Sequence, residues 1–343
     1  MSVDSSSSED LLTMTVRELA KDTSCGRPHV VILGAGASAA TLPDGDRDGN
    51  RVPLMPDLTE ALGLESILDT NGIEYRGNFE EIYGALSKDQ KYSNLVEAIN
   101  ARVQHYFSRL ALPSYPTIYD HLVLSLRAKD LIATFNWDPF LYHACWRNHK
   151  KAKLPRVVYL HGNVAVGYCL PHMQKGKADT ECPVCGKTYA PSKLLFPIGQ
   201  KDYTKDPFIK NEWEALRWHL KQAYMLTIFG YSAPQSDAEA IRLMKDAWGS
   251  PNDRNLEQTE IIDIKRPEVL RVQWDEFIHS HHYDVMDNFY DSSIALFPRR
   301  TCEAQWNSTM ECRFLEQNPV PRDLDFENLW KWFDILIQEE KLS

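Results

Sequence analysis

The chain of 343 residues contains no apolar run of the ~20 residues that a membrane-spanning helix needs. Its first ten residues, MSVDSSSSED, are polar and acidic, so they resemble neither a signal peptide nor a basic transit peptide. Hydrophobic residues make up 43% of the chain and charged residues 25%, which is ordinary for a soluble globular enzyme. We therefore expect a cytoplasmic protein with no membrane partner.

An excess of positive charge is also missing. The formal net charge is −10, which argues against a duplex-binding surface, so direct nucleic-acid binding is not expected. Seven cysteines in a chain without a secretion signal make a disulfide framework improbable. The complete G-x-G-x-x-G fingerprint is absent because Ala39 stands where the third glycine would be, and this disfavours a hydride-transferring dehydrogenase.

Five apolar segments predict buried strands, and helical patterns lie between them. The segments are HVVIL (29–33), LIATFNWD (131–138), RVVYLHGN (156–163), YMLTIFGYSA (224–233) and EIIDIKRP (260–267). This alternation predicts an α/β fold, a Rossmann-like doubly wound parallel sheet. Ligands bind at the carboxyl ends of the strands in such sheets, and each segment ends in polar residues.

Three regions are expected along the chain. A polar tail and short helix occupy 1–27, the sheet domain occupies 28–267, and a helical appendage occupies 268–343. The sheet domain carries a helical insertion at about 57–130 and a small zinc knuckle at about 165–190.

The GAGAS segment after the first strand is a candidate phosphate loop. Gly34 and Gly36 would let backbone N–H groups approach a pyrophosphate, and the dipole of the following helix would favour its negative charge. A simple tight turn accounts for the same two glycines, so both interpretations stay open.

A second motif has the spacing of a metal site, C-x2-H-x9-C-x2-C. Its two close ligand pairs suit a closed tetrahedral structural zinc, and the ECPVCGK segment supplies the knuckle turn. The alternative is a reduced cysteine cluster without metal. The four candidate ligands are Cys169, His172, Cys182 and Cys185.

Polar residues at other strand ends are candidates for catalysis or for helix capping. His161 could act as a general base near neutral pH or be a hydrogen-bonded structural residue. Asn136 and Asp138 could cap the helix that starts at Pro139, which explains the aspartate better than the asparagine. Ser232, with Asp237 five residues later, could likewise belong to a capping loop.

Taken in order, five elements resemble the sirtuin superfamily over about residues 28–267. They are GAGAS (34–38) with Pro43 and Asp44, TFNWD (134–138), HG (161–162), the knuckle and GYS (230–232). The resemblance implies an NAD-binding domain in which Asn136 and Asp138 hold the nicotinamide ribose and a catalytic water, while His161 acts on the ribose hydroxyls. It implies that the NAD phosphates and riboses contact Gly34, Ala35, Gly36, Ser38, Asp44, Gly230 and Ser232.

Departures from the deacylating sirtuins shift the expected activity. Gly45 and Asp46 stand where those enzymes have Phe and Arg, and LLFPIGQKDY (194–203) replaces the FGE segment next to the acyl-lysine channel. The segment PLMPDLTEAL (53–62) resembles bacterial sirtuin-like proteins that consume NAD in antiphage defence.

The expected function is therefore hydrolysis of NAD, as a substrate, to ADP-ribose and nicotinamide, in a defence effector triggered by homo-oligomerisation or a partner protein. A fixed polar pocket can stabilise the charge that develops on the ribose as nicotinamide departs. The alternatives are an NAD-dependent protein deacylase and a non-catalytic module that binds NAD or ADP-ribose.

Overall fold

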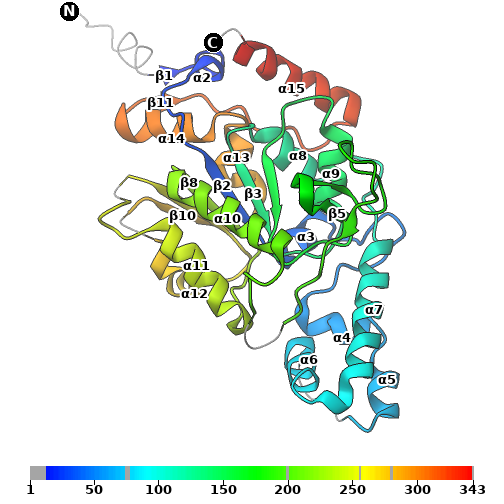
Figure 1. Ribbon diagram of the computed structural model, residues 1–343. Coiled ribbons are helices and arrows are strands. Elements are labelled where there is room, and N and C mark those ends of the chain that lie inside the picture. Colours follow the sequence, from blue (N-terminus) through cyan, green and yellow to red (C-terminus); the bar gives the residue numbers. More distant parts are fainter. Residues whose placement is uncertain (1–12, 74–77, 198–200, 255, 279–280, 342–343) are drawn as a thin grey trace, which may run out of the picture.

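The computed structural model describes residues 13–73, 78–197, 201–254, 256–278 and 281–341. Six strands form one parallel sheet in the order β10-β9-β8-β2-β3-β4 (Figure 1). From β2 the chain winds outward through β3 to β4, and from β8 it winds the other way through β9 to β10, which is the doubly wound arrangement. The predicted fold class is confirmed. The strands are β2 His29–Leu33, β3 Leu131–Thr134, β4 Arg156–Tyr159, β8 Met225–Phe229, β9 Gln258–Ile262 and β10 Tyr283–Met286.

The five predicted strands all lie in this sheet. Strands β2, β3, β8 and β9 are buried along their whole length, as expected for strands covered on both faces. The sixth strand corrects the expectation that 268–343 is a purely helical appendage, because β10 pairs in parallel with β9. Its sequence, YDVM, is only half-buried at the sheet edge, so it lacks the continuous apolar run that marked the other strands.

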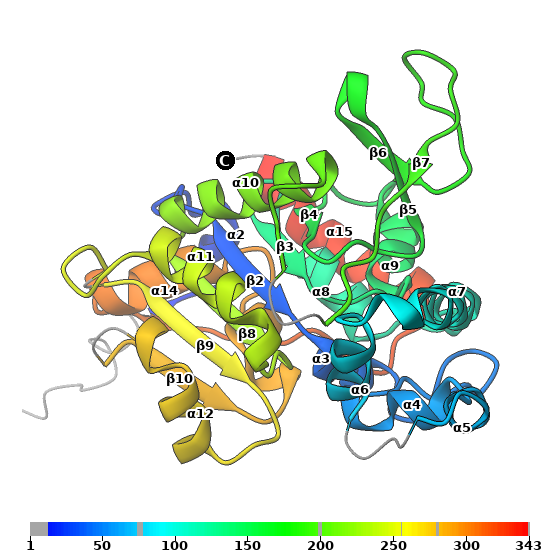
Figure 2. The ribbon, with the colours of Figure 1, turned by 60° about the horizontal axis from the view of Figure 1, so that its bottom comes forward.

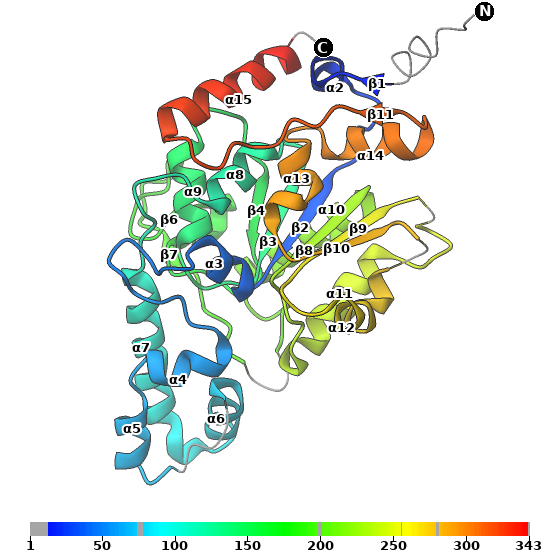
Figure 3. The ribbon, with the colours of Figure 1, turned by 180° about the vertical axis from the view of Figure 1, so that it is seen from behind.

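Helices cover both faces of the sheet. On one face α10, α11 and α12 pack against alternate strand residues such as Ile32 and Ile228 (Figure 1). On the other face α3, α8, α9 and α13 pack against Val31 and Phe229 (Figure 3). The bounds are α3 Ala35–Thr41, α8 Ile118–Ser125, α9 Phe140–Asn148, α10 Pro207–Gln222, α11 Ala238–Trp248, α12 Pro267–Gln273 and α13 Ser293–Leu296.

Helices also fill most of the predicted insertion. They form a lobe at the lower end of the molecule in Figure 1, and α8 returns the chain to the sheet. The longest, α7, buries Leu95, Ile99 and Val103, one side chain per turn, against the lobe interior. The lobe contains α4 Leu58–Ala61, α5 Glu65–Thr70, α6 Phe79–Leu86 and α7 Ser93–Arg109.

A three-stranded antiparallel sheet carries the cysteine motif. It projects from the main sheet beyond β4 (Figure 2), with strand order β6-β5-β7. Its strands are β5 Val166–Cys169, β6 Gln174–Lys177 and β7 Ala190–Pro191.

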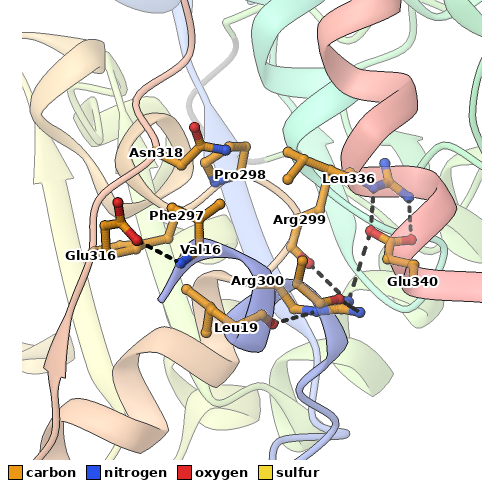
Figure 4. Close-up of a pocket in the computed structure, with 11 residues that line it drawn as sticks. Val16, Leu19, Phe297, Pro298, Arg299, Arg300, Glu316, Asn318, Leu336 and Glu340 are labelled. Atoms are coloured by element: carbon orange, nitrogen blue, oxygen red, sulfur yellow. Dashed lines mark hydrogen bonds and ion pairs between the residues drawn. The ribbon is translucent and has the colours of Figure 1, made fainter. Parts of the chain in front are cut away.

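The two ends of the described chain meet above the amino-terminal ends of the main-sheet strands, at the top of the molecule in Figure 1. Strand β1 pairs with β11, and α15 packs on α2. Arg299 donates to the Glu340 carboxylate over 3.0 Å, and Arg300 donates to the Leu19 carbonyl over 3.1 Å (Figure 4). The expected polar tail lies largely outside the described residues. These terminal elements are β1 Thr13–Met14, α2 Val16–Lys21, α14 Thr301–Met310, β11 Phe314–Leu315 and α15 Phe326–Lys341.

Short 3-10 turns complete the connections. They are η1 Met55–Asp57, η2 Gln90–Tyr92, η3 Leu170–His172, η4 Gln235–Asp237, η5 Asp275–Phe277 and η6 Phe289–Asp291. Among the helices that the structure describes, none combines the length and apolar character required to cross a bilayer.

Candidate active site

The loops after β2 and β8 lie side by side at the carboxyl edge of the sheet. The two strands are paired, with Leu33 opposite Phe229, and the winding direction of the chain reverses between them. Doubly wound proteins bind ligands in the crevice that such a reversal creates. The residues of these loops and of the neighbouring strand ends therefore form the candidate site.

Three glycines allow the two loops to touch. Gly36 donates its N–H to the Gly230 carbonyl over 2.9 Å. A Cβ atom on Gly34 would lie 2.5 Å from the same carbonyl oxygen. Gly230 has φ +59°, and a Cβ atom there would lie 2.2 Å from the Ala37 nitrogen. Close backbone packing thus explains all three glycines, whereas phosphate binding by this loop stays a prediction.

Beside the first loop, four buried polar side chains form a hydrogen-bonded group that we call the amide cluster: Ser38, Tyr119, Asn136 and Asp138. The Ser38 hydroxyl donates to Asp138 Oδ2 over 2.7 Å and lies 2.8 Å from the Tyr119 hydroxyl. The Asn136 amide nitrogen donates to Ser38 Oγ over 2.9 Å. The structure therefore brings together three predicted site residues, from α3 and from the segment after β3.

The orientation of the Asn136 amide is fixed by its partners. Its Nδ2 donates to the Gly34 carbonyl over 2.9 Å, and a carbonyl oxygen can only accept. The Oδ1 atom must then point the other way, and it accepts no hydrogen bond from any residue that the structure describes. Asn136 thus presents an open acceptor at the strand ends, which helix capping does not explain.

Asp138 has two functions in the local structure. Its Oδ1 accepts from the Phe140 N–H over 3.2 Å at the start of α9, while Oδ2 belongs to the amide cluster. The helix begins at Phe140 with Pro139 as its N-cap, one residue later than predicted, so Asp138 supports the helix start from the position before the cap. Burial raises the pKa of Asp138 to about 6, although the hydrogen bonds from Ser38 and Phe140 act in the opposite direction. Asp138 is therefore mostly ionised at neutral pH and becomes protonated in mildly acidic solution, so the cluster carries one carboxylate among neutral groups.

A second group surrounds the end of β4, and we call it the histidine cluster: His161, Lys201, Tyr203, Tyr231 and Asp237. His161 Nε2 lies 3.2 Å from the Tyr203 hydroxyl and 3.7 Å from Asp237 Oδ1. Lys201 forms an ion pair with Asp237 Oδ1, and the Tyr231 hydroxyl donates to Asp237 Oδ2 over 2.8 Å. The carboxylate is thus fully engaged beside the imidazole.

The protonation states in the histidine cluster follow from burial and charge. Burial, and after it the positive charge of Lys201, lower the pKa of His161 to about 3, although Asp237 acts the other way. Burial alone would raise the pKa of Asp237, but its interactions with His161 and Lys201 and the hydrogen bond from Tyr231 lower it. His161 is therefore a neutral imidazole next to an ionised carboxylate.

Phe135 and Asn163 connect the two clusters. The Phe135 ring meets His161 edge-on at 4.8 Å and stacks on Tyr231 at 4.1 Å. The Asn163 amide donates to the Asp138 carbonyl over 2.6 Å. Phe135 directly precedes Asn136 of the amide cluster and contacts the histidine cluster. Asn163 lies two residues after His161 and contacts the amide cluster. The two residues therefore hold the ends of β3 and β4 together.

Other predicted residues lie outside these contacts. Ala35, Asp44 and Ser232 are exposed and make no hydrogen bond to either cluster within the described chain. Next to His161, a Cβ atom on Gly162 would lie 2.1 Å from the Lys193 carbonyl oxygen, so the chain itself, rather than a ligand, occupies the space beside that glycine.

Four members of the clusters were not predicted: Tyr119, Lys201, Tyr203 and Tyr231, the last within the GYS segment whose glycine and serine alone were candidates. Tyr119 comes from α8 within the helical insertion, where its apolar neighbours gave no functional signal. Lys201 and Tyr203 belong to LLFPIGQKDY, whose only signal in the sequence is its departure from the deacylating sirtuins. Lys201 is only 6% exposed in the folded protein, and the sequence alone gives no sign that this lysine is buried.

The four predicted metal ligands converge in the three-stranded sheet. Their ligand atoms all lie within 4.8 Å of one another, with Cys169 Sγ 3.8 Å from Cys185 Sγ and 3.4 Å from His172 Nδ1. A tetrahedral zinc with Zn–S bonds of about 2.3 Å separates its sulfur ligands by about 3.8 Å, so these side chains can hold zinc. With four protein ligands the site would be closed and structural.

The backbone around these ligands has the predicted turn. Gly186 has φ +68°, and its N–H donates to the Cys182 carbonyl over 2.8 Å. From this module the chain returns past β4, where Leu195 donates its N–H to the His161 carbonyl over 2.9 Å. The module that carries the candidate metal ligands therefore precedes the segment that supplies Lys201 and Tyr203, and the Leu195 hydrogen bond joins the start of that segment to the end of β4.

No family model and no curated protein matches this chain. Among solved structures, the chain is similar to one described in work on the mechanism and regulation of Sir2 enzymes, with 14% identity, TM-score 0.38, and coverage of 94% of this chain and 98% of that chain. It is also similar to a Sir2 homolog–NAD complex, with 13% identity, TM-score 0.34, and coverage of 86% and 91%.

A third similar structure is Sir2 bound to an acetylated peptide, with 14% identity, TM-score 0.33, and coverage of 83% of this chain and 93% of that chain. Because these identities and TM-scores are low, the chemistry has to be derived from the residues of this chain.

Proposed function

We propose that this chain hydrolyses NAD at the bond between nicotinamide and ribose, with water as the acceptor. The observation that carries the proposal is the Asn136 amide, whose nitrogen is held by Gly34 and Ser38 while its Oδ1 stays open at the point where the sheet reverses. An oriented amide oxygen can accept a hydrogen bond from a water molecule and aim it at a reacting carbon.

In this reaction the carbon–nitrogen bond to nicotinamide breaks, and the nicotinamide leaves with the bonding electron pair. Water forms the new carbon–oxygen bond, and one proton is released together with ADP-ribose. Asn136 Oδ1 orients the water, and the carboxyl group of Asp138 stabilises the positive charge that develops on the ribose. His161, neutral because of its burial, accepts a hydrogen bond or a proton from a ribose hydroxyl.

Water is favoured over an acyl-lysine acceptor by the surroundings of His161. Lys201 and Tyr203 come from the segment that replaces the one next to the acyl-lysine channel of deacylating sirtuins, and they engage Asp237 and His161. A buried ion pair is a poor lining for an apolar acyl chain, because its charges need polar partners.

The test is nicotinamide and ADP-ribose formation by the purified full chain, with NAD alone and with NAD plus an acetyl-lysine peptide. We expect both products in equal amounts without peptide and their loss in Asn136→Ala. The matched control is Asn94→Ala, an exposed asparagine on α7, which should keep full activity. Peptide-dependent turnover would instead support a deacylase, and NAD binding without turnover a regulatory module.

We also propose that the hydrolase serves as an antiphage defence effector. The resemblance of PLMPDLTEAL to the corresponding segment of NAD-consuming bacterial effectors supports this role. Expression of the chain should then arrest growth and deplete cellular NAD, and Asn136→Ala should relieve both effects.

A further inference from the structure

Lys201 is a buried cation to which the hydrolysis mechanism assigns no direct step. Its side chain is 4% exposed, and so is that of its partner Asp237. Taking two charges out of water costs several kcal/mol per ion, and an apolar pair of the same volume is often equally stable. A buried ion pair that touches a candidate catalytic group is therefore more easily explained by chemistry than by stability.

The ion pair acts on one side of the His161 ring only. Asp237 Oδ1 is 3.7 Å from Nε2, and the Tyr203 hydroxyl is 3.2 Å from the same nitrogen. The opposite nitrogen, Nδ1, has no hydrogen-bond partner among the residues that the structure describes. Nε2 therefore interacts with the protein, and Nδ1 is the nitrogen available to a substrate.

The charge of Asp237 decides how firmly His161 would hold a second proton. A carboxylate close to Nε2 stabilises an imidazolium, in which Nδ1 no longer accepts a proton. Here Lys201 compensates the charge on Oδ1, while the Tyr231 hydroxyl occupies Oδ2. The remaining neighbours of the ring, Phe135 and Tyr203, carry no charge at neutral pH.

We propose that Lys201 is a positioning residue for NAD hydrolysis: by neutralising Asp237, it prevents the carboxylate from drawing a proton onto His161 and keeps the imidazole available as a base. This inference rests on the proposed function for its purpose. The effect on His161, however, is a property of the protein without NAD and can be measured separately.

The direct test is the pH titration of His161 by NMR in the full-length protein, with its signals identified by their loss in His161→Gln. In the unsubstituted protein we expect His161 to stay neutral down to the acid limit of folding. In Lys201→Met we expect a titration midpoint roughly 1–3 pH units higher, because the carboxylate is no longer compensated. Lys201→Arg keeps the charge and should restore the low midpoint.

The combination Lys201→Met with Asp237→Asn removes both charges, and the midpoint should return to its low value. If Lys201→Met does not fold, Lys201→Gln retains a polar contact without the charge and carries the same expectation. A folded Lys201 variant without the charge in which His161 still does not titrate would overturn the inference.

The activity of the same variants separates this inference from the proposed function. If the chain hydrolyses NAD, the acid limb of its pH–rate profile should move to higher pH in Lys201→Met by the same amount as the NMR midpoint. A shifted NMR midpoint without any NAD turnover would support the inference about His161 and contradict the proposed hydrolase. An NMR shift without a corresponding shift of the acid limb would contradict the catalytic role of Lys201.

Discussion

The amide cluster and the histidine cluster lie at the same edge of one sheet but are stabilised differently. In the amide cluster, Ser38, Tyr119 and Asn136 exchange hydrogen bonds among neutral groups, and Asp138 is the single carboxyl. In the histidine cluster, a full ion pair between Lys201 and Asp237 is buried next to an imidazole. We propose that the amide cluster controls the geometry of the reaction and the histidine cluster controls protonation.

Substitution of the two proposed catalytic groups should produce the largest effects. Asn136→Ala should lower NAD hydrolysis by about 10²–10³-fold at every pH, because a fixed polar group is lost. His161→Ala should lower it by about 10²–10⁴-fold, because a proton acceptor is lost. Initial rates between pH 5 and 9 measure both. A pH-dependent defect in Asn136→Ala would contradict the division between the clusters.

Stability should respond more strongly in the histidine cluster. Lys201→Met leaves Asp237 charged and unpaired, and should lower the free energy of unfolding by about 3–5 kcal/mol. Ser38→Ala removes neutral hydrogen bonds and should cost about 1–2 kcal/mol. Urea unfolding of both variants gives the comparison, with Lys201→Met combined with Asp237→Leu as the control that should recover most of the loss. Equal costs for the two single variants would show that the ion pair contributes no more than the neutral network.

Removal of zinc should loosen one cluster before the other. The zinc-binding module leads through Leu195 to Lys201 and Tyr203, whereas Ser38 and Asn136 follow strands of the main sheet. A strong chelator should therefore lower hydrogen-exchange protection by about tenfold or more in residues 166–195 and 201–206, with little change in β2 and β3. Cys182→Ser should reproduce the pattern, while the exposed Cys312→Ser should not. Uniform loss of protection would show that the module stabilises the whole domain.

The pH dependence of stability should have opposite signs in the two clusters. The pKa of Asp138 is raised from 3.8 to about 6 by burial, so the folded protein keeps a proton that the unfolded chain releases, and stability falls as pH rises from about 4 to about 6. The pKa of His161 is lowered from 6.5 to about 3 by burial, so the unfolded chain takes up the proton and stability rises over about pH 3–6.5.

Two variants isolate these opposing contributions. For each variant we compare its free energy of unfolding with that of the unsubstituted protein at pH 4 and at pH 7. As pH rises from 4 to 7, this difference should shift by about 1–3 kcal/mol in favour of Asp138→Asn and by about 1–3 kcal/mol against His161→Gln. Chemical unfolding at both pH values measures the differences. The same sign for both variants would disprove the assigned protonation states.

Sequence patterns predicted the fold and singled out three of the four residues of the amide cluster. Fully buried parallel strands such as β2 and β8 are continuous apolar runs, and the polar residues that follow such strands mark the carboxyl edge of the sheet. Ser38 lies in α3 just after β2, and Asn136 and Asp138 follow β3, so their positions near the ends of two neighbouring strands are enough to group them. The zinc ligands could be predicted for a similar reason, because their spacing alone brings close pairs together.

The rest depends on contacts between residues far apart in the chain. Lys201 and Asp237 are separated by 36 residues, and neither position shows that it will be buried against the other. Strand β10 escaped prediction because its four residues, YDVM, are interrupted by Asp284 and are only partly buried at the sheet edge. Gly34 and Gly36 pack closely on Gly230, and a phosphate-binding loop would also require glycine at these positions. The sequence alone therefore could not distinguish close backbone packing from phosphate binding.

The central claim is that Asn136 directs water onto NAD, and nicotinamide release by the purified full chain tests it most directly. With NAD as the only substrate, we predict equal amounts of nicotinamide and ADP-ribose from the unsubstituted protein and from Asn94→Ala, and at least a ~100-fold lower rate from Asn136→Ala. Release that requires an acyl-lysine peptide, or that is unchanged in Asn136→Ala, would contradict the account.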